Sequence, residues 1–174
     1  PYNDPQIIAG QGTLAIELLD QLPRLDVVYV SIGGGGLISG IGSVLKAFSP
    51  KTRVVGVSAK NSAELAASIR AGKMVKVDHH ETLADGCAGG VDSDTITLGL
   101  GSEVIDDLID CSEQQIKSGL QQIAWSEKML VEGSAGLAYA AWQEDAQKNK
   151  NKISAVVLCG ANFDKETLSP IVNS

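Results

Sequence analysis

The sequence has few aromatic residues, few cysteines, no long apolar run and no excess of positive charge. Aromatic side chains make up 4% of the chain, and 21 acidic residues against 14 Lys and Arg give a formal net charge of −7. A chain without a basic cluster is not expected to bind nucleic acid or an anionic membrane surface. No apolar run approaches the roughly 18 residues of a membrane span, so no membrane-spanning protein is expected.

The three cysteines, Cys87, Cys111 and Cys159, are odd in number and far apart. This pattern is typical of reduced thiols in a cytoplasmic protein rather than of a disulfide framework. No CxxC pair is present to indicate a structural zinc site. The polar, turn-like start at Pro1 does not predict a secretory signal. Because no initiator methionine precedes Pro1, we expect the chain to be a piece of a longer polypeptide.

Strand-like and helix-like segments alternate along the chain. Runs of β-branched residues predict strands at 26–32, 53–58, 107–111 and 153–158, and helical spacing of apolar residues predicts helices at 10–22, 37–48, 61–69, 112–124 and 137–142. Capping boxes are expected at Asn61 with Glu64 and at Ser112 with Gln115. The alternation predicts an α/β fold of three layers, with a mostly parallel sheet and helices on both faces. We expect a single domain over residues 1–174.

Several conspicuous residues have ordinary interpretations. Residues 72–100 lack a clear period and are expected to form loops, including a solvated segment at His79, His80 and Glu81, whose adjacent side chains diverge. Trp125 and Trp142 are expected to pack, and the acidic residues Glu103, Asp106 and Asp107 to form an exposed face.

The main functional motif is a run of four glycines, Gly33, Gly34, Gly35 and Gly36, between a predicted buried strand and a predicted helix. Open α/β sheets bind ligands at this position. Four residues without Cβ atoms let the backbone N–H groups converge on one anion, and the following helix adds its positive end. A tight packed turn is the alternative, but such a turn needs only one or two glycines.

The loop favours a single phosphate group over a nucleotide. In the dinucleotide pattern GxGxxG, the third glycine would fall on Ile38 or Ser39, and the Lys-Ser/Thr ending of a P-loop is absent. The sequence therefore predicts a phosphate monoester as the ligand.

The motifs together resemble the serine/threonine dehydratases, pyridoxal-phosphate enzymes with the tryptophan-synthase-β-like fold. The resemblance covers essentially the whole chain and rests on four segments in the family's order: Gly10-Gln11-Gly12-Thr13, Gly33 to Gly40 (GGGGLISG), Ala84-Asp85-Gly86 and Cys159-Gly160-Ala161-Asn162. It implies pyridoxal 5′-phosphate as cofactor and a parent enzyme that forms a homo-oligomer.

The resemblance also implies a set of cofactor-binding residues. The phosphate would be held by Gly33, Gly34, Gly35, Gly36 and Leu37. Gly86 would bring its backbone near the pyridine ring and Glu132 would lie beside it, although Gly133 stands where the family usually has proline. Cys159 occupies the position that faces the pyridine nitrogen. The plain alternative for Cys159 is an ordinary buried cysteine at a strand end.

A thiol at Cys159 would have a chemical consequence. It is a neutral, weak donor and cannot hold the ring nitrogen protonated as an aspartate would. The ring would then be a poorer electron sink, which suits prompt loss of a β-hydroxyl group from serine or threonine. The family's metal site matches Ser58, Ser62 and Glu64, but a serine hydroxyl is a poor ligand for a hard cation, so no metal is expected.

The resemblance places the Schiff-base lysine in a segment before Pro1, so no catalytic residue is expected in this chain and the chain alone is expected to be inactive. The chain is interpreted as the C-terminal half of an ammonia-lyase that converts threonine or serine to a 2-oxo acid and ammonia. Three alternatives stay open: a serine- or aspartate-type racemase, a hydroxyaspartate dehydratase, and a non-catalytic domain that binds a phosphate ligand such as a sugar phosphate.

Overall fold

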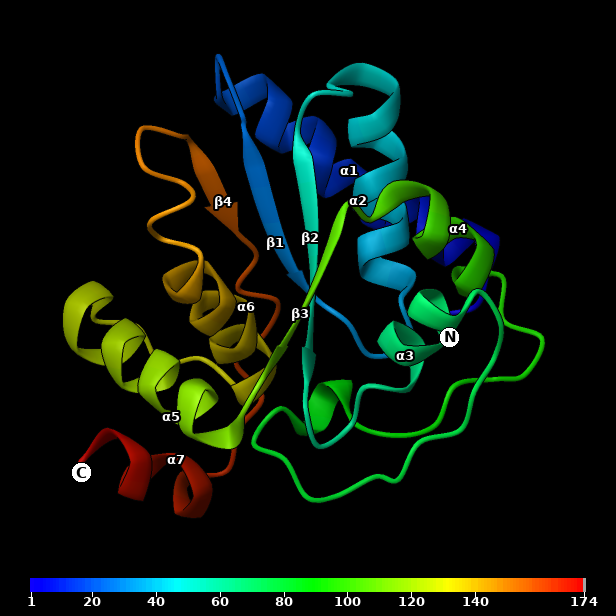
Figure 1. The fold of residues 1–174 in the computed structure, drawn as a ribbon. Helices are drawn as coiled ribbons and strands as arrows, with labels where there is room; N and C mark the ends of the chain where they lie inside the picture. The colour runs from blue at the N-terminus through cyan, green and yellow to red at the C-terminus, as the bar shows by residue number, and fades with distance from the viewer. Residues whose placement is uncertain (174) are drawn as a thin grey trace.

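The computed structural model describes residues 1–173 and has a four-stranded parallel sheet at its centre (Figure 1). The strands are β1 (Val27–Ser31), β2 (Arg53–Ala59), β3 (Asp107–Cys111) and β4 (Ser154–Val156), in the spatial order β3-β2-β1-β4. The chain passes from β1 outward to β2 and β3, and then returns to place β4 on the other side of β1. The loops after β1 and β4 therefore leave the sheet at a topological switch point, where such sheets bind ligands.

Helices cover both faces of the sheet (Figure 1). One face carries α1 (Pro5–Gln21), α2 (Gly36–Phe48), α3 (Glu64–Ala71) and α4 (Thr97–Val104), and the other carries α5 (Glu113–Gln122), α6 (Gly133–Glu144) and α7 (Lys165–Val172). Alternate residues of β1 separate the two cores: Val27 and Tyr29 pack with α5 and α6, whereas Val28 and Val30 pack with α1 and α2. The prediction of a three-layer α/β fold is confirmed.

Some helices begin or end at other residues than predicted, because the capping residue was missed or the helix propensity of the segment is low. α1 begins at Pro5, because the Asp4 carboxylate accepts hydrogen bonds from the N–H groups of Gln6 and Ile7 and so caps the helix. α4 was not predicted, and its first four residues lie in the segment that was expected to be irregular; its two glycines lower its helix propensity. It forms because Thr97, Gly101 and Val104 are buried. α7 was not predicted; it buries Leu168 and Ile171 despite an internal proline.

Two capping predictions had different outcomes. The capping box of Ser112 and Gln115 is confirmed, with both hydrogen bonds present at the start of α5. The box of Asn61 and Glu64 is wrong: α3 is preceded by Ala63 without a side-chain cap, and the Asn61 side chain donates to the Glu81 carbonyl instead. Glu64 turns away from its own helix to contacts in the loop that follows.

The two tryptophans also differ. Trp142 is half-buried against the core and contacts Tyr139. Trp125 is 59% exposed, so its predicted packing role is wrong; its indole N–H donates to the Val172 carbonyl at the surface. The acidic residues Glu103, Asp106 and Asp107 are exposed, as expected.

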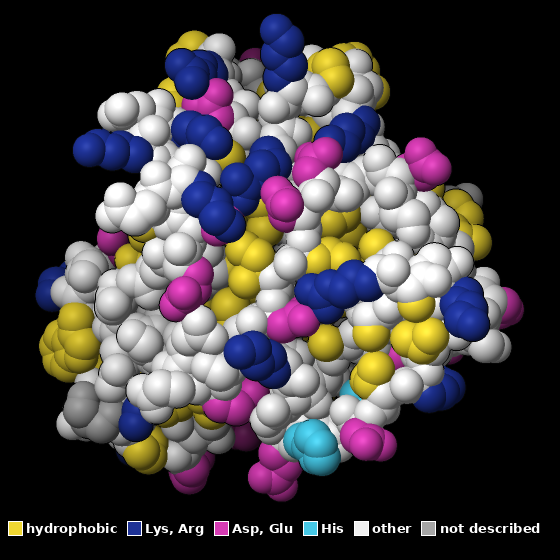
Figure 2. Space-filling model, in the orientation of Figure 1, with side chains coloured by type: hydrophobic (Ala, Val, Ile, Leu, Met, Phe, Trp, Pro, Cys, Tyr) yellow, Lys and Arg dark blue, Asp and Glu magenta, His cyan; other side chains and the backbone are white. Residues whose placement is uncertain are grey.

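Basic and acidic side chains are interspersed on the face shown in Figure 2. None of the described helices is both long and apolar enough to cross a membrane.

Candidate functional site

A cavity of about 260 Å³ lies at the carboxyl ends of β1 and β4. It is lined by all eight residues of the predicted site, Gly33, Gly34, Gly35, Gly36, Leu37, Gly86, Glu132 and Cys159, together with Tyr2, Ser31, Cys87 and Ser134. A larger hollow of about 590 Å³ lies between α1 and α2, but its lining is mainly apolar and includes no residue of the predicted site. The smaller cavity brings together residues from five segments of the chain.

The floor of this cavity is made of backbone amides without acceptors. Among the described residues, the N–H groups of Gly33 to Leu37 donate to no acceptor, and Gly35 caps α2 without a side-chain hydrogen bond. These groups stand at the N-terminus of a 13-residue helix, where the helix dipole is positive. Such an arrangement binds an anion with several oxygens.

The loop has this shape because its residues lack side chains. Gly35 has φ of +87°, a left-handed conformation that residues with a Cβ rarely adopt. A Cβ on Gly35 would overlap the Leu65 side chain, and a Cβ on Gly33 would lie 3.0 Å from Cα of Cys87. Close packing therefore requires glycine at positions 33 and 35, and the loop lines the cavity with amides that have no acceptor. The residues fit a phosphate group.

Glu132 lies between the two loops that were expected to bracket the cofactor ring. Its carboxylate accepts a hydrogen bond of 2.9 Å from the Asn162 N–H, and its own N–H donates to the Gly160 carbonyl. A Cβ on Gly86 would lie 3.3 Å from this carboxylate, and a Cβ on Gly160 would clash with it. The side chain is thus held at the base of α6 against glycine backbone on both sides.

The glycine at position 133, in place of the family's usual proline, has a structural reason. Gly133 is the first residue of α6, and any Cβ on it would overlap the carbonyl oxygen of Leu83. The backbone of the Leu83–Ala84 segment passes so close to α6 that only glycine fits. This contact holds the Gly86 turn beside Glu132.

Two thiols line the same cavity. Cys159 opens to solvent on one side, but burial of its remaining surface raises the pKa of its thiol to about 12, and Cys87 and Glu132 act in the same direction. Burial likewise raises the pKa of the Cys87 thiol, opposed in part by the Ser134 hydroxyl. Both thiols are therefore neutral near pH 7.

Four lining residues were not predicted from the sequence. Ser31, at the end of β1, donates a 2.6 Å hydrogen bond to the Ser134 carbonyl and so joins the strand to the start of α6. Cys87 follows Gly86 directly. Position alone could have indicated Cys87, which follows Gly86, and Ser31 and Ser134, which lie two residues from Gly33 and Glu132, whereas no signal pointed to Tyr2.

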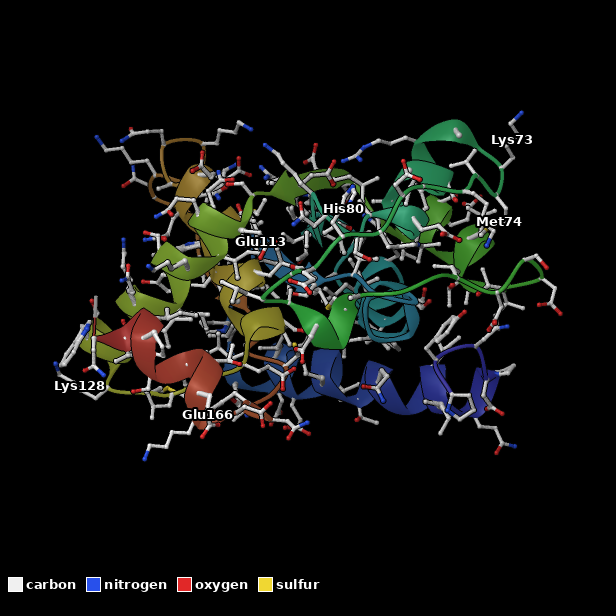
Figure 3. The ribbon with its side chains drawn as sticks, turned by 90° about the horizontal axis from the view of Figure 1, so that it is seen from below. Lys73, Met74, His80, Glu113, Lys128 and Glu166 are labelled. Carbon is white, nitrogen blue, oxygen red and sulfur yellow. The ribbon has the colours of Figure 1, made fainter. Side chains whose placement is uncertain are left out.

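The segment from 72 to 96, which carries Gly86 and Cys87, crosses beneath the carboxyl ends of the strands. Figure 3 views this end of the molecule and labels Lys73 and Met74 at the start of the segment, His80 further along it, and Glu113 at the start of α5. The Glu113 carboxylate accepts a 2.7 Å hydrogen bond from the Leu83 N–H. The segment has little regular secondary structure, but this hydrogen bond attaches it to α5.

Its main attachment is Glu64, whose side chain is 1% exposed. The carboxylate accepts from Lys76, from the Val91 N–H and from His79 Nε2, and His79 Nδ1 lies 2.8 Å from the Ser62 hydroxyl. His79 is an exposed loop residue, as expected, but its ring also links Glu64 to Ser62, which the sequence did not predict. Burial acts to raise the pKa of Glu64, but the hydrogen bonds from His79, Val91 and Lys76 outweigh it and hold this pKa below its ordinary value.

We expect Glu64→Gln to destabilise the chain by about 1 to 3 kcal/mol at pH 7, because an amide cannot replace the buried charge that Lys76 and His79 neutralise. Urea unfolding measures this loss. The pKa of Glu64 is lower in the folded chain than in the unfolded chain, so its carboxylate adds to the free energy of unfolding. This stabilisation is complete above about pH 4.5 and disappears as the pH falls through the folded pKa. The difference between the variant and the original chain should vanish in the same range.

The control is Glu103→Gln, at an exposed position of α4. It should change the free energy of unfolding by less than about 0.5 kcal/mol. Equal stability of Glu64→Gln and the original chain at pH 7 would show that the carboxylate does not hold the loop.

Comparisons with known proteins identify the family of the chain. The family described as pyridoxal-phosphate dependent enzyme matches residues 1–160. The L-threonine ammonia-lyase of Thermotoga maritima is 35% identical over 173 residues, which cover 99% of this chain and 43% of that protein. The chain spans about half the length of the curated relatives it matches.

Two solved structures have the same fold over nearly the whole chain. The processed form of threonine deaminase isoform 2 from Solanum lycopersicum has a TM-score of 0.90 at 28% identity, and the match covers 98% of this chain and 50% of that one. Serine racemase from Dictyostelium discoideum has a TM-score of 0.84 at 30% identity, covering 93% of this chain and 52% of that one.

Proposed function

The chain belongs to the family of pyridoxal-phosphate dependent enzymes, and from that premise we propose that it is the C-terminal, phosphate-binding half of an ammonia-lyase. The proposed enzyme removes water and ammonia from threonine or serine and releases a 2-oxo acid. The relatives named as threonine ammonia-lyase and threonine deaminase support this choice of reaction. The three free cysteines support the cytoplasm as its location.

The observation that carries the proposal is the set of unpartnered amides from Gly33 to Leu37 in the cavity. Several charge-assisted hydrogen bonds to one phosphate would each contribute about 1.5 to 3 kcal/mol. The described lining contains no Lys or Arg, so no cationic side chain of the lining would hold the phosphate.

The remaining lining residues would orient the cofactor. Pyridoxal phosphate, when bound, supplies a ring that stabilises negative charge developing at the α-carbon of the substrate. The Gly86 backbone and the Glu132 carboxylate would border this ring, with Glu132 held in place by the Asn162 N–H. The Cys159 thiol, neutral because its pKa is raised, would place no charge beside the ring nitrogen. That environment favours elimination over a long-lived carbanion.

Binding is tested with pyridoxine 5′-phosphate and pyridoxine, whose alcohol group cannot react with surface lysines as an aldehyde does. We define the phosphate preference as the dissociation constant of pyridoxine divided by that of pyridoxine 5′-phosphate. We expect a preference of about 100-fold or more, because one ligand uses the amides and the other does not. Equal dissociation constants would contradict a phosphate site.

The second test concerns the reaction. The described cavity lining offers no amine that could form a covalent bond with the cofactor, so we expect the isolated chain with pyridoxal 5′-phosphate to release no 2-oxo acid from threonine or serine. A polypeptide that contains this chain and a lysine-bearing segment should release 2-oxo acid and ammonia. Activity of the isolated chain would contradict the assignment of catalysis to residues outside it.

The similarity to serine racemase supports a second candidate within the same family. The product distinguishes the two reactions, because a racemase converts L-serine to D-serine without releasing ammonia. A non-catalytic phosphate-binding domain would show the phosphate preference but no reaction in any longer polypeptide.

A further inference from the structure

Tyr2 lies directly over the glycine loop. It lines the cavity, and a Cβ on Gly34 would overlap its ring. A Cβ on Gly36 would lie 2.6 Å from its carbonyl oxygen. Ring and backbone of Tyr2 therefore pack against two of the four glycines and form one wall of the cavity.

Tyr2 is fixed in this position by Asp92, 90 residues further along the chain. The Tyr2 hydroxyl donates a 2.7 Å hydrogen bond to the Asp92 carboxylate and accepts a 2.8 Å hydrogen bond from the Asp92 N–H. The next residue, Asn3, accepts through its side-chain oxygen from the Ile96 N–H at 2.8 Å. The start of the chain is thus tied to residues 92–96.

The segment that holds Tyr2 also holds the glycine loop from behind. The Thr97 hydroxyl, which is fully buried, donates a 2.7 Å hydrogen bond to the Gly34 carbonyl. The described residues contain no cis peptide bond. In a trans peptide the N–H points opposite to the carbonyl, so fixing the Gly34 carbonyl also fixes the direction of the Gly35 N–H. Gly34 is held by Tyr2 on one side and by Thr97 on the other.

We propose that Tyr2 and Asp92 form a clamp that fixes the glycine loop in the conformation that binds phosphate. Tyr2 is a positioning residue in this clamp: its ring covers the loop, and Asp92 holds the ring in place. A loop fixed before binding loses less conformational entropy when the phosphate arrives, and so binds it more tightly. This inference rests on the proposed function and adds to it the residues that control phosphate affinity.

The clamp makes graded predictions for the phosphate preference. Tyr2→Ala removes ring and hydroxyl and should lower the preference about tenfold, whereas Tyr2→Phe keeps the ring and should lower it about threefold. The affinity for pyridoxine should fall less than the affinity for pyridoxine 5′-phosphate in both variants, because only the phosphate contacts the glycine loop. Asp92→Ala should match Tyr2→Phe, and the double variant should be no worse than either single one, because both remove the same contact.

Tyr139→Phe and Tyr139→Ala are the matched controls, since Tyr139 packs against Trp142 on α6 and is not among the cavity-lining residues. Both should leave the phosphate preference unchanged, even where Tyr139→Ala lowers stability. A purely structural role of Tyr2 would lower stability but leave the preference unchanged.

The outcomes separate the clamp from the proposed function. If the original chain shows the preference and Tyr2→Ala keeps it in full, or if Tyr2→Phe and Asp92→Ala act additively, the clamp is wrong and the phosphate site stands. If the original chain shows no phosphate preference, the proposed phosphate site is contradicted, and so is the clamp that depends on it. A graded, non-additive loss confirms both.

Discussion

Replacing Gly35 by alanine is expected to lower the affinity for pyridoxine 5′-phosphate by about 100-fold and to leave the affinity for pyridoxine nearly unchanged. The backbone of Gly35 has φ of +87°, and a Cβ there would overlap the Leu65 side chain and lie 3.1 Å from Cβ of Thr97. Leu65 is buried and alanine disfavours a φ of +87°, so we expect the loop to leave this conformation and the amides of Gly33 to Leu37 to turn away from a common point. Losing one or two charge-assisted hydrogen bonds accounts for this size of effect.

Gly72→Ala is the matched control for backbone strain. Gly72 also has a positive φ, of +66°, but it ends α3 and a Cβ on it would have no neighbour within 4 Å. Alanine there should cost about 1 kcal/mol of stability and leave the phosphate preference intact. Equal loss of preference in both variants would mean that strain in general, rather than the loop itself, controls binding.

Replacing Gly133 by alanine is expected to destabilise the chain by about 3 kcal/mol or more, the largest stability effect predicted for a single methyl group here. The added Cβ would overlap the Leu83 carbonyl oxygen, which belongs to backbone and cannot rotate away as a side chain can. α6 would have to move from the Leu83–Ala84 segment and would take Glu132 with it. Urea unfolding, monitored through the loss of helical signal, measures the change in the free energy of unfolding.

Gly99→Ala serves as the control for adding a methyl group to a helix. Gly99 lies in α4, and a Cβ on it would have no neighbour within 4 Å. Alanine has the higher helix propensity, so this variant should be up to about 1 kcal/mol more stable. An unfolding curve of Gly133→Ala that coincides with that of the original chain would show that the close approach of Leu83 is not required.

Local sequence signals predicted the sheet and the helices beside it well. The strand runs around Val28 and Val54 are buried on both faces, so they contain continuous β-branched residues that are easy to recognise. The glycine loop was recognisable because four successive residues without side chains have few other uses. The cavity lined by Gly33 to Leu37, Gly86, Glu132 and Cys159 matches the predicted set, and its role as a cofactor site stays a prediction until binding is measured.

The contacts that the sequence could not reveal depend on strand order and on distant pairs. Tyr2 meets Gly34 only because the segment before α1 lies beside the carboxyl end of β1, and its partner Asp92 is 90 residues away. Glu64 fits a capping box in sequence, yet its buried carboxylate gains more from Lys76, His79 and Val91 than from its own helix. Local patterns predict local hydrogen bonds, and tertiary contacts override them where the side chain is buried.

The most direct test of the account is to follow the backbone amides by ¹⁵N–¹H NMR while the chain is titrated with pyridoxine 5′-phosphate. The account predicts that the amide signals of Gly33 to Leu37 shift most and move downfield, as expected for N–H groups that gain a charged acceptor, and that pyridoxine leaves them in place. If those five signals stay fixed while amides elsewhere respond to the phosphorylated ligand, the glycine loop is not the phosphate site.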